Sequence, residues 1–385
     1  MKKIKKFIIK VISLNMVIFF SIFNNIKILA ADSISVLAKS AILIDQKTGN
    51  VLYEYNSDQQ EAPASLTKIM SLILIFENLE SGNLSESEML KCSKYANSIN
   101  GSQIWLDEGE EMSVHDLLKA VIISSANDAT VVIAEKIAGS EKNFVDIMNE
   151  RAKKMGLKYT HFENCTGLDK DNQLTTAREV AIMASELLKH EKIFDFTKIW
   201  MDQLRDGKTK LVNTNRLIRF YPGSTGLKTG TSDNAGCCLA ASATRDNLSL
   251  ISVVMGAENT EDRFQMSKEL LDYGFNNFIS VKLEDIQKDL PNLKIDKGNE
   301  EYVGLRVVAP GSLLIEKNKL NKIKQKINLP NKIEAPVLEN QIIGSVIVSV
   351  DNEKILEYPI ISSQEVKKIN FSGALKKIII NIIKI

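Results

Sequence analysis

The sequence predicts an α+β domain that is followed by a small all-β domain. Strand and helix signals are mixed between residues 33 and 275: residues 35–45 have the alternation of a strand, and apolar residues recur at helical spacing from Leu66 to Leu74. After Ser280 the helical periodicity fades and only short β-type segments follow. A chain of 385 residues corresponds to roughly two to three domains, which agrees with this division.

The elements of the first domain, to which we assign residues 32–276, follow one another in order. Residues 35–45 and 51–55 form a predicted hairpin around the turn Lys47-Thr48-Gly49-Asn50. Ser113, with Asp116 three residues later, has the spacing of a capping box and begins a predicted helix that runs to Ile123. The other predicted elements are helices at 128–138 and 261–273 and strands at 239–244 and 248–255.

The N-terminus has the three parts of a secretory signal peptide. Lys2, Lys3, Lys5 and Lys6 form a basic start, residues 7–23 are mostly apolar, and Leu29-Ala30-Ala31 offers small residues for cleavage. We therefore predict a signal peptide at residues 1–31 and a protein that is exported to the outer face of the cytoplasmic membrane or the cell wall. A retained N-terminal anchor is the alternative.

Composition excludes a collagen, a disordered tail and a multi-span membrane protein, and the charge balance argues against a nucleic-acid binder. The apolar and charged fractions of 44% and 25% are those of a globular protein, and the formal charge of +1 lacks the basic excess of a nucleic-acid binder. The four cysteines show neither CxxC nor Cys/His metal spacing, so we expect buried free thiols, although an exported chain could pair them. They are Cys92, Cys165, Cys237 and Cys238.

The end of the chain divides into two predicted parts. Residues 281–365 form the small β domain, with strand signals at 302–308, 312–316, 342–350 and 354–361. Residues 366–385 carry five lysines and no acid after Glu365, and on a helical wheel most apolar residues share one face and the lysines the other. This pattern predicts an amphipathic helix on an anionic membrane surface. A helix packed on the β domain is the alternative.

The first chemical motif is Ser65-Leu66-Thr67-Lys68, which begins an apolar helix. Ser65 and Lys68 are three residues apart and therefore share one face. A serine hydroxyl needs a base beside it to act as a nucleophile, and a lysine whose pKa is lowered can be that base. Alone, the motif also fits a helix cap beside a solvated lysine.

Two further motifs follow. Ser125-Ala126-Asn127 falls between two apolar helices, where a hydroxyl could relay a proton and an amide could hold a substrate carbonyl. Lys228-Thr229-Gly230 precedes a predicted strand; the Lys and Thr could bind a carboxylate, and the glycine would let a peptide approach the backbone. Each triplet alone also fits a polar turn or loop.

The three motifs together, in this order, resemble those of the low-molecular-mass penicillin-binding proteins, the serine D-alanyl-D-alanine carboxypeptidases. Three further stretches are similar to this family: 101–104, 164–168 and 221–223. The resemblance implies the penicillin-binding/β-lactamase-like fold, with an antiparallel sheet flanked by helices and a helical subdomain. It calls for no metal or organic cofactor. The implied partners are the peptidoglycan stem peptide and β-lactam antibiotics.

The resemblance also assigns roles to residues of this sequence. Ser65 would be the acylated nucleophile, Lys68 its proton acceptor, and Ser125 and Asn127 would complete the proton network and position the substrate. Lys228 and Thr229 would bind the terminal carboxylate of the substrate beside Gly230. The oxyanion hole would consist of the backbone N–H groups of Ser65 and Thr231, and Arg263 would add charge for the carboxylate.

One departure from the family pattern and two alternatives remain. Thr166 and Gln173 stand where many members carry a histidine, so a secondary role for histidine is not expected here.

A class A β-lactamase needs a Glu in a Glu-x-x-Leu-Asn context, which none of the glutamates between the second and third motifs has. These are Glu163, Glu179, Glu186 and Glu191. A non-catalytic penicillin-recognising cell-wall binding protein would not need the intact Ser65/Lys68 pair. Endopeptidase activity would use the same residues.

Overall fold

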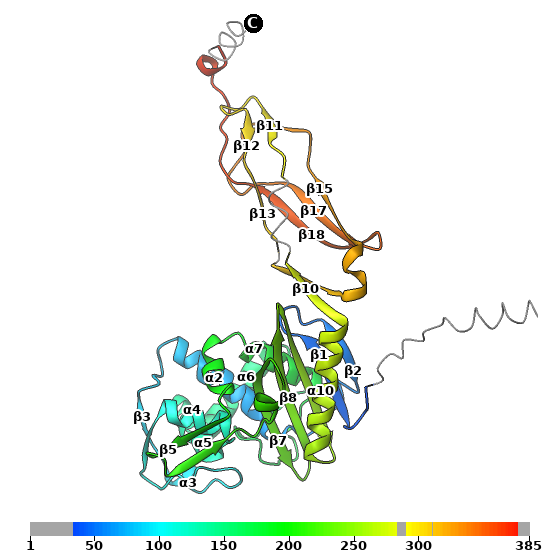
Figure 1. Ribbon diagram of the computed structural model, residues 1–385. Coiled ribbons are helices and arrows are strands. Elements are labelled where there is room, and N and C mark those ends of the chain that lie inside the picture. The colour runs from blue at the N-terminus through cyan, green and yellow to red at the C-terminus, as the bar shows by residue number, and fades with distance from the viewer. Residues whose placement is uncertain (1–33, 283–289, 310, 376–385) are drawn as a thin grey trace, which may run out of the picture. The chain divides into compact units, whose positions relative to one another are not determined.

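The computed structural model describes residues 34–282, 290–309 and 311–375. The predicted signal peptide lies outside these residues, as does the end of the predicted amphipathic helix. The described chain contains a part with both helices and strands, followed by a part built almost entirely of strands (Figure 1). This is the α+β and all-β division that the sequence predicts.

A five-stranded antiparallel sheet forms the centre of the first part. Its order is β2-β1-β9-β8-β7, so the strand that carries the third motif lies at an edge. The strands are β1 (Ser40–Asp45), β2 (Val51–Tyr55), β7 (Ser224–Ser232), β8 (Gly236–Arg245) and β9 (Leu248–Ala257). The predicted hairpin and the two predicted later strands are thus confirmed, although β1 begins five residues after the predicted position.

Helices cover both faces of this sheet because successive strand residues point to opposite sides. Helix α10 (Thr260–Asn277) packs on one face of the sheet (Figure 1). Its Gly274 lies against Leu43 and Leu250. On the other face Ile42 and Ile251 belong to the same buried cluster as the apolar side of α2 (Lys68–Glu80). This cluster also includes residues of α4 (Val114–Ile123), α5 (Asn127–Ala138), α6 (Glu141–Lys154) and α7 (Ala177–Leu187).

Local capping begins several of these helices where the sequence predicts. The hydroxyl of Ser113 accepts a hydrogen bond from the N–H of Asp116 at 3.1 Å, which confirms the predicted cap of α4. Helix α10 begins after Asn259, whose side chain accepts from two backbone amides. The other helices of this part are α3 (Lys94–Asn97), α8 (Phe194–Thr197) and α9 (Leu217–Phe220). Two hairpins join β3 (Met89–Lys91) with β4 (Glu111–Ser113) and β5 (Met201–Leu204) with β6 (Thr209–Val212). After α10, β10 (Phe278–Lys282) pairs antiparallel with β14 (Ser312–Glu316).

The second part of the chain consists of small sheets. Four strands pair in the order β13-β18-β17-β15, and three in the order β12-β11-β16. Their bounds are β11 (Leu293–Asp296), β12 (Tyr302–Val303), β13 (Leu305–Val307), β15 (Ile323–Asn328), β16 (Lys332–Glu334), β17 (Ile342–Val350) and β18 (Glu353–Ser362). The core of the four-stranded sheet includes Val346, Val348, Tyr358 and Ile360.

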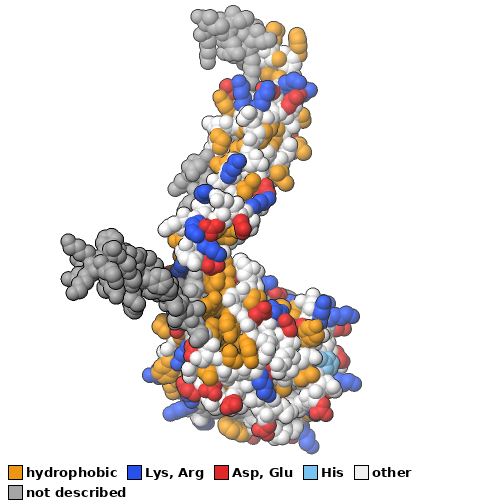
Figure 2. All heavy atoms as spheres, turned by 90° about the vertical axis from the view of Figure 1, so that its right-hand side faces the viewer, with side chains coloured by type: hydrophobic (Ala, Val, Ile, Leu, Met, Phe, Trp, Pro, Cys, Tyr) orange, Lys and Arg blue, Asp and Glu red, His pale blue; other side chains and the backbone are white. Residues whose placement is uncertain are grey.

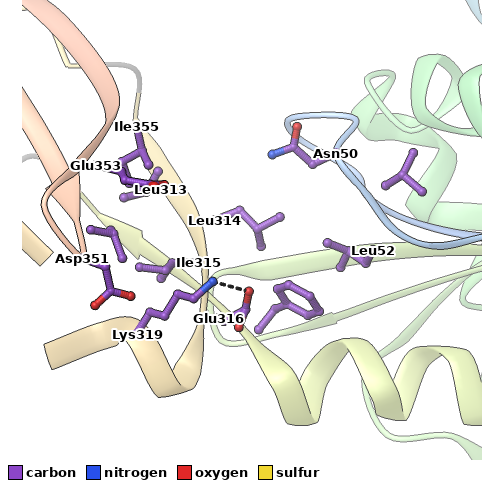
Figure 3. A pocket seen from close by; sticks show the side chains of 13 residues that line it. Asn50, Leu52, Leu313, Leu314, Ile315, Glu316, Lys319, Asp351, Glu353 and Ile355 are labelled. Atoms are coloured by element: carbon purple, nitrogen blue, oxygen red, sulfur yellow. Dashed lines mark hydrogen bonds and ion pairs between the residues drawn. The ribbon is translucent and has the colours of Figure 1, made fainter. Parts of the chain in front are cut away.

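A pocket is lined by side chains of β14 (Ser312–Glu316), of the β17–β18 turn and of residues 50–52 (Figure 3). At its rim the ammonium of Lys319 donates to the Glu316 carboxylate at 2.7 Å (Figure 3). No lining residue belongs to the three sequence motifs, so this pocket is separate from the candidate active site.

Surface charge and the cysteines agree with the expectations from composition. Positive and negative side chains are intermingled over the face drawn in Figure 2. All four cysteines are buried and unpaired.

Residues 371–375 are helical and Phe371 is 85% exposed. Among the residues described, no helix is both long and apolar enough to cross a membrane.

Candidate active site

The three sequence motifs meet at one place in the structure. The ammonium nitrogen of Lys68 lies 2.6 Å from the side-chain oxygen of Asn127, which joins the first motif to the second. A Cβ atom at Gly230 would lie 3.1 Å from the backbone nitrogen of Ser65, which joins the first motif to the third. Residues that are far apart in the sequence therefore form one site at the edge of the central sheet.

Ser65 lies in a short 3-10 turn rather than in the α-helix itself. The turn covers Ala64–Thr67, and α2 begins at Lys68. Because a 3-10 helix has three residues per turn, residues at i and i+3 lie directly above one another. The Lys68 Nζ is accordingly 3.1 Å from the Ser65 Oγ. The predicted pairing of the two side chains is present, through a tighter turn than the predicted helix start.

Lys68 is buried and surrounded by oxygen atoms. It is 0% exposed, and its Nζ lies 2.6 Å from both Asn127 Oδ1 and the backbone carbonyl of Thr166. Burial lowers the pKa of Lys68 from 10.5 to about 7. A neutral amine has two hydrogens, which these two oxygens accept, so its lone pair faces the Ser65 hydroxyl. The geometry is that of a base beside a nucleophile.

The second motif forms the turn between α4 and α5. Ser125 is 5% exposed, has a φ of 63°, and its Oγ has no hydrogen-bond partner within the described chain. Asn127 is the first residue of α5 rather than its cap. Its backbone N–H donates to Ser102 O at 2.7 Å and its Nδ2 to Asn100 O at 2.7 Å. The side-chain amide of Asn127 is therefore held through its oxygen by Lys68 and through its nitrogen by Asn100 O. One N–H of Nδ2 is left for another acceptor.

Strand β7 forms the wall opposite Ser65. At Gly230 a Cβ atom would lie 3.1 Å from both Pro63 O and Ser65 N, which is closer than ordinary contact distance. A side chain here would push β7 and the 3-10 turn apart by a few tenths of an ångström, so glycine allows their close approach. This approach brings the backbone N–H of Ser65 next to the Gly230–Thr231 segment, where the oxyanion hole was predicted.

The other two residues of the third motif are also buried. Lys228 is 1% exposed, its Nζ donates to Thr229 O at 3.0 Å, and burial together with the neighbouring Lys68 and Arg263 charges lowers its pKa well below 10.5. The Thr229 hydroxyl pairs with that of Thr214 at 2.7 Å. Thr214 was not singled out from the sequence, because a lone threonine in a polar loop carries no signal.

Arg263 holds the β7 backbone. Its Nη1 donates to Gly230 O at 2.9 Å and to Thr231 Oγ1 at 2.8 Å, and its Nε is buried without a partner in the described chain. The side chain is 6% exposed. The predicted residue is thus at the site, and the contacts present position the strand.

A loop that the sequence motifs do not include completes the site. It provides the Thr166 carbonyl that accepts from Lys68. Its Gly167 has a φ of +90°, and a Cβ there would lie 1.8 Å from Ala64 O, so the loop lies directly on the 3-10 turn. The Asn164 side chain accepts from the N–H groups of Thr166 and Gly167. A backbone carbonyl has no sequence signature, which is why this contact was not predicted.

Gln173 stabilises the same loop. Its side-chain oxygen accepts from the N–H groups of Glu163 and Asn164, both at 2.9 Å. An amide network thus orders this loop. No group of three His, Cys, Asp or Glu side chains with metal-binding geometry occurs among the described residues.

Comparison with known proteins identifies the family. Residues 27–259 match the Peptidase S11 family, D-alanyl-D-alanine carboxypeptidase, and residues 283–368 match the C-terminal domain of penicillin-binding protein 5. The chain is 42% identical over 344 residues to D-alanyl-D-alanine carboxypeptidase DacF of Bacillus subtilis, with 88% of each chain covered. It is 33% identical to DacC of Escherichia coli, over 88% of this chain and 86% of that one.

Solved structures agree with these relatives. Penicillin-binding protein 5 from Haemophilus influenzae superposes with a TM-score of 0.76 and 32% identity, covering 87% of this chain and 98% of that one. Penicillin-binding protein D2 from Listeria monocytogenes in its ampicillin-bound form gives a TM-score of 0.57 and 31% identity, covering 62% and 97%. The chain therefore belongs to the Peptidase S11 family of serine D-alanyl-D-alanine carboxypeptidases.

Proposed function

We propose that this protein removes the terminal D-Ala from peptidoglycan stem pentapeptides through an acyl-enzyme on Ser65. The observation that carries this proposal is the contact of Ser65 Oγ with the Nζ of Lys68, a fully buried lysine whose pKa is lowered to about 7. Such a lysine is partly neutral at physiological pH and can accept the proton of a serine hydroxyl.

In the acylation step, the Ser65 Oγ attacks the carbonyl carbon between the two D-Ala residues while its proton passes to Lys68 Nζ. The negative oxygen of the tetrahedral intermediate accepts hydrogen bonds from the N–H groups of Ser65 and Thr231. The C–N bond then breaks, and the departing amine of the last D-Ala takes a proton from Lys68 through the otherwise unpartnered Ser125 hydroxyl. The result is an ester on Ser65 and free D-Ala.

Binding of the substrate carboxylate falls to the third motif. A bound carboxylate beside Lys228 would raise the lowered pKa of that lysine again, so that Lys228 can offer a positive charge, and Thr229 supplies a hydroxyl that already pairs with Thr214. Gly230 lets the peptide lie along the β7 edge, since this strand has a neighbour on one side only in the central sheet. Arg263 acts by holding the carbonyl of Gly230, and its charge favours an anion nearby.

Water then hydrolyses the ester and restores Ser65. A β-lactam contains a strained amide in the place of the D-Ala-D-Ala bond, and its leaving nitrogen stays attached to the acyl group. We therefore expect penicillin to form a covalent adduct on the same hydroxyl. Listeria penicillin-binding protein D2 has solved ampicillin-bound and cefotaxime-bound forms, which supports this expectation.

The contacts of the glutamates weigh against a β-lactamase. Glu163 accepts from the backbone of Asn172, and Glu179 from the backbone of Lys158 and Tyr159. Glu186 pairs with Arg151, so its carboxylate is also engaged away from Ser65. None of the described contacts of Ser65 or Lys68 involves a carboxylate that could activate a deacylating water.

We also propose that the protein is exported and is held on the membrane by residues 366–385. The basic and apolar N-terminal residues 1–31 and the lysine-rich C-terminal segment support this location. Deleting residues 366–385 should release the protein from vesicles that contain anionic lipid. If the truncated protein binds these vesicles as well as the full chain does, the segment is not the anchor.

The enzymatic proposal is tested by incubating the purified protein with a stem pentapeptide and measuring free D-Ala. The wild-type protein should release D-Ala, and Ser65→Ala should release none. Ser71→Ala is a suitable control, because Ser71 is a buried serine one turn along α2 that contacts the Cys165 carbonyl rather than Lys68. Release of D-Ala by Ser65→Ala at the wild-type rate would show that the nucleophile is wrongly assigned.

A further inference from the structure

Trp105 is an exposed aromatic residue in a strained conformation. Its side chain is 75% exposed, and its φ is +53°, in the left-handed region that bulky residues rarely adopt. Strain of this kind persists only when the surrounding structure enforces it, and it is concentrated at functional sites. The mechanism above does not use this residue.

Contacts on both sides of Trp105 hold its backbone rigidly. The N–H groups of Ile104 and Leu106 both donate to the buried Asp128 carboxylate at 3.1 Å. The guanidinium of Arg205 donates to the carbonyls of Ile104, at 2.9 Å, and Trp105, at 3.3 Å. The side chains of Ile104 and Leu106 are buried, so the indole between them is directed outward.

The same segment borders the catalytic site. Ser102 O accepts from the backbone N–H of Asn127, whose side chain contacts Lys68. Trp105 is three residues further along, which is at most about 10 Å of chain. Its indole is therefore within reach of the part of a stem peptide that precedes the two D-Ala residues.

Charge near Trp105 favours a cationic group. The acidic residues that follow it are Asp107, Glu108, Glu110 and Glu111. Arg205 is paired with Glu110, and Lys91 lies opposite Glu111 in the β3–β4 hairpin. Asp107 and Glu108 are exposed; Asp107 lies near enough to Arg205 to help raise the pKa of that guanidinium, but neither carboxylate forms a close ion pair with a Lys or Arg in the part of the chain that the structure describes.

We infer that Trp105 determines substrate specificity by binding the aliphatic ammonium side chain of the residue that precedes D-Ala-D-Ala. The methylene groups would lie on the indole and the ammonium over its face, with the exposed carboxylates nearby. A cation–π contact of this kind changes an equilibrium constant by roughly 3- to 30-fold. This inference rests on the proposed carboxypeptidase function and adds a preference among its substrates.

The test compares two tripeptides, Nα-acetyl-L-Lys-D-Ala-D-Ala with its ε-amine free and the same peptide with that amine acetylated. The wild-type protein should hydrolyse the free-amine peptide with a kcat/KM about tenfold higher, mainly through a lower KM. Trp105→Ala should bring the ratio of the two kcat/KM values to about one. Trp105→Phe should keep much of this ratio, because an aromatic ring is retained. The double variant Asp107→Asn with Glu108→Gln should reduce the ratio, because both carboxylates are removed. Phe220→Ala, which removes another exposed aromatic side chain, should leave the ratio at the wild-type value.

The outcomes separate the inference from the function on which it rests. A wild-type ratio of one, or a Trp105→Ala ratio equal to that of the wild type, overturns the role of Trp105. If the wild-type protein releases D-Ala from neither peptide, the carboxypeptidase function itself is wrong.

Fluorescence provides a second readout that does not need turnover. The chain has two tryptophans, so Trp200→Phe leaves Trp105 as the only indole. With Ser65→Ala added to prevent hydrolysis, the free-amine peptide should change the emission of Trp105 more than the acetylated peptide does. Equal changes, or none, with the two peptides contradict the inference.

Discussion

The rate of acylation of Ser65 should depend on pH through Lys68. The lysine is fully buried, and this burial lowers its pKa from 10.5 to about 7. Because only the neutral amine accepts the Ser65 proton, the acylation rate should rise as pH increases through about 7. About a tenth of the lysine is neutral at pH 6 and about nine tenths at pH 8, so the rate should increase about tenfold between these values.

The measurement is the second-order rate constant for penicillin adduct formation between pH 5 and pH 9, followed by mass spectrometry of the intact protein. Lys68→Arg is the comparison variant, because a guanidinium stays protonated throughout this range and cannot accept a proton. Its rate should be lower by roughly 10²- to 10⁴-fold and should not rise near pH 7. A wild-type rate that is constant from pH 5 to pH 9, or that still increases tenfold per pH unit up to pH 9, would refute the assignment of Lys68 as a base with a lowered pKa.

Three further predictions follow from positions around Lys68. Gly230→Ala should slow acylation by roughly 10²- to 10³-fold, as the loss of an oxyanion donor does. The free energy of unfolding should change little, because Gly230 does not have a positive φ. A wild-type rate of acylation would contradict the close approach of β7 to Ser65. Gly167→Ala should lower the free energy of unfolding by about 3 kcal/mol or more, because the added Cβ would overlap Ala64 O. The control Gly139→Ala has a similar positive φ but open space around it, and should lower that free energy by about 1 kcal/mol. Equal losses for the two variants in urea denaturation would show that the overlap at Gly167 is relieved. Asp128→Asn should shift the pH midpoint of acylation below that of the wild type, because the Asp128 carboxylate raises the pKa of Lys68; an unchanged or higher midpoint would be inconsistent with that influence.

Elements with local signals could be predicted from the sequence. The Ser113 cap is encoded within four residues, and the helix that follows it ends at Ile123 as predicted. The strands β8 and β9 are almost continuously apolar because helices cover both faces of the sheet. These apolar stretches of sequence are what predicted the two strands.

Contacts between distant backbone atoms could not be predicted in this way. The carbonyl of Thr166 accepts from Lys68, which is 98 residues away in the sequence, and a carbonyl is common to every residue type. The 3-10 turn at Ser65 depends on Gly167 and Gly230, which pack on it from two sides. The resemblance indicated which residues meet, and the structure supplies the reasons why these two glycines are needed.

Arg263 illustrates the limit of assigning a role from residue type alone. A guanidinium near a carboxylate site suggests direct binding of the anion. In the structure its Nη1 donates to Gly230 O and Thr231 Oγ1 and thereby fixes β7, whereas its Nε has no partner in the described chain. The charge of Arg263 still contributes to the lowered pKa of Lys228.

The most direct test of the account locates the penicillin adduct within the sequence. Protein treated with penicillin is digested, and the modified peptide is identified by tandem mass spectrometry. We expect a single adduct on the hydroxyl of Ser65, absent from the Ser65→Ala protein. An adduct on any other residue, or an adduct that persists in Ser65→Ala, would contradict it.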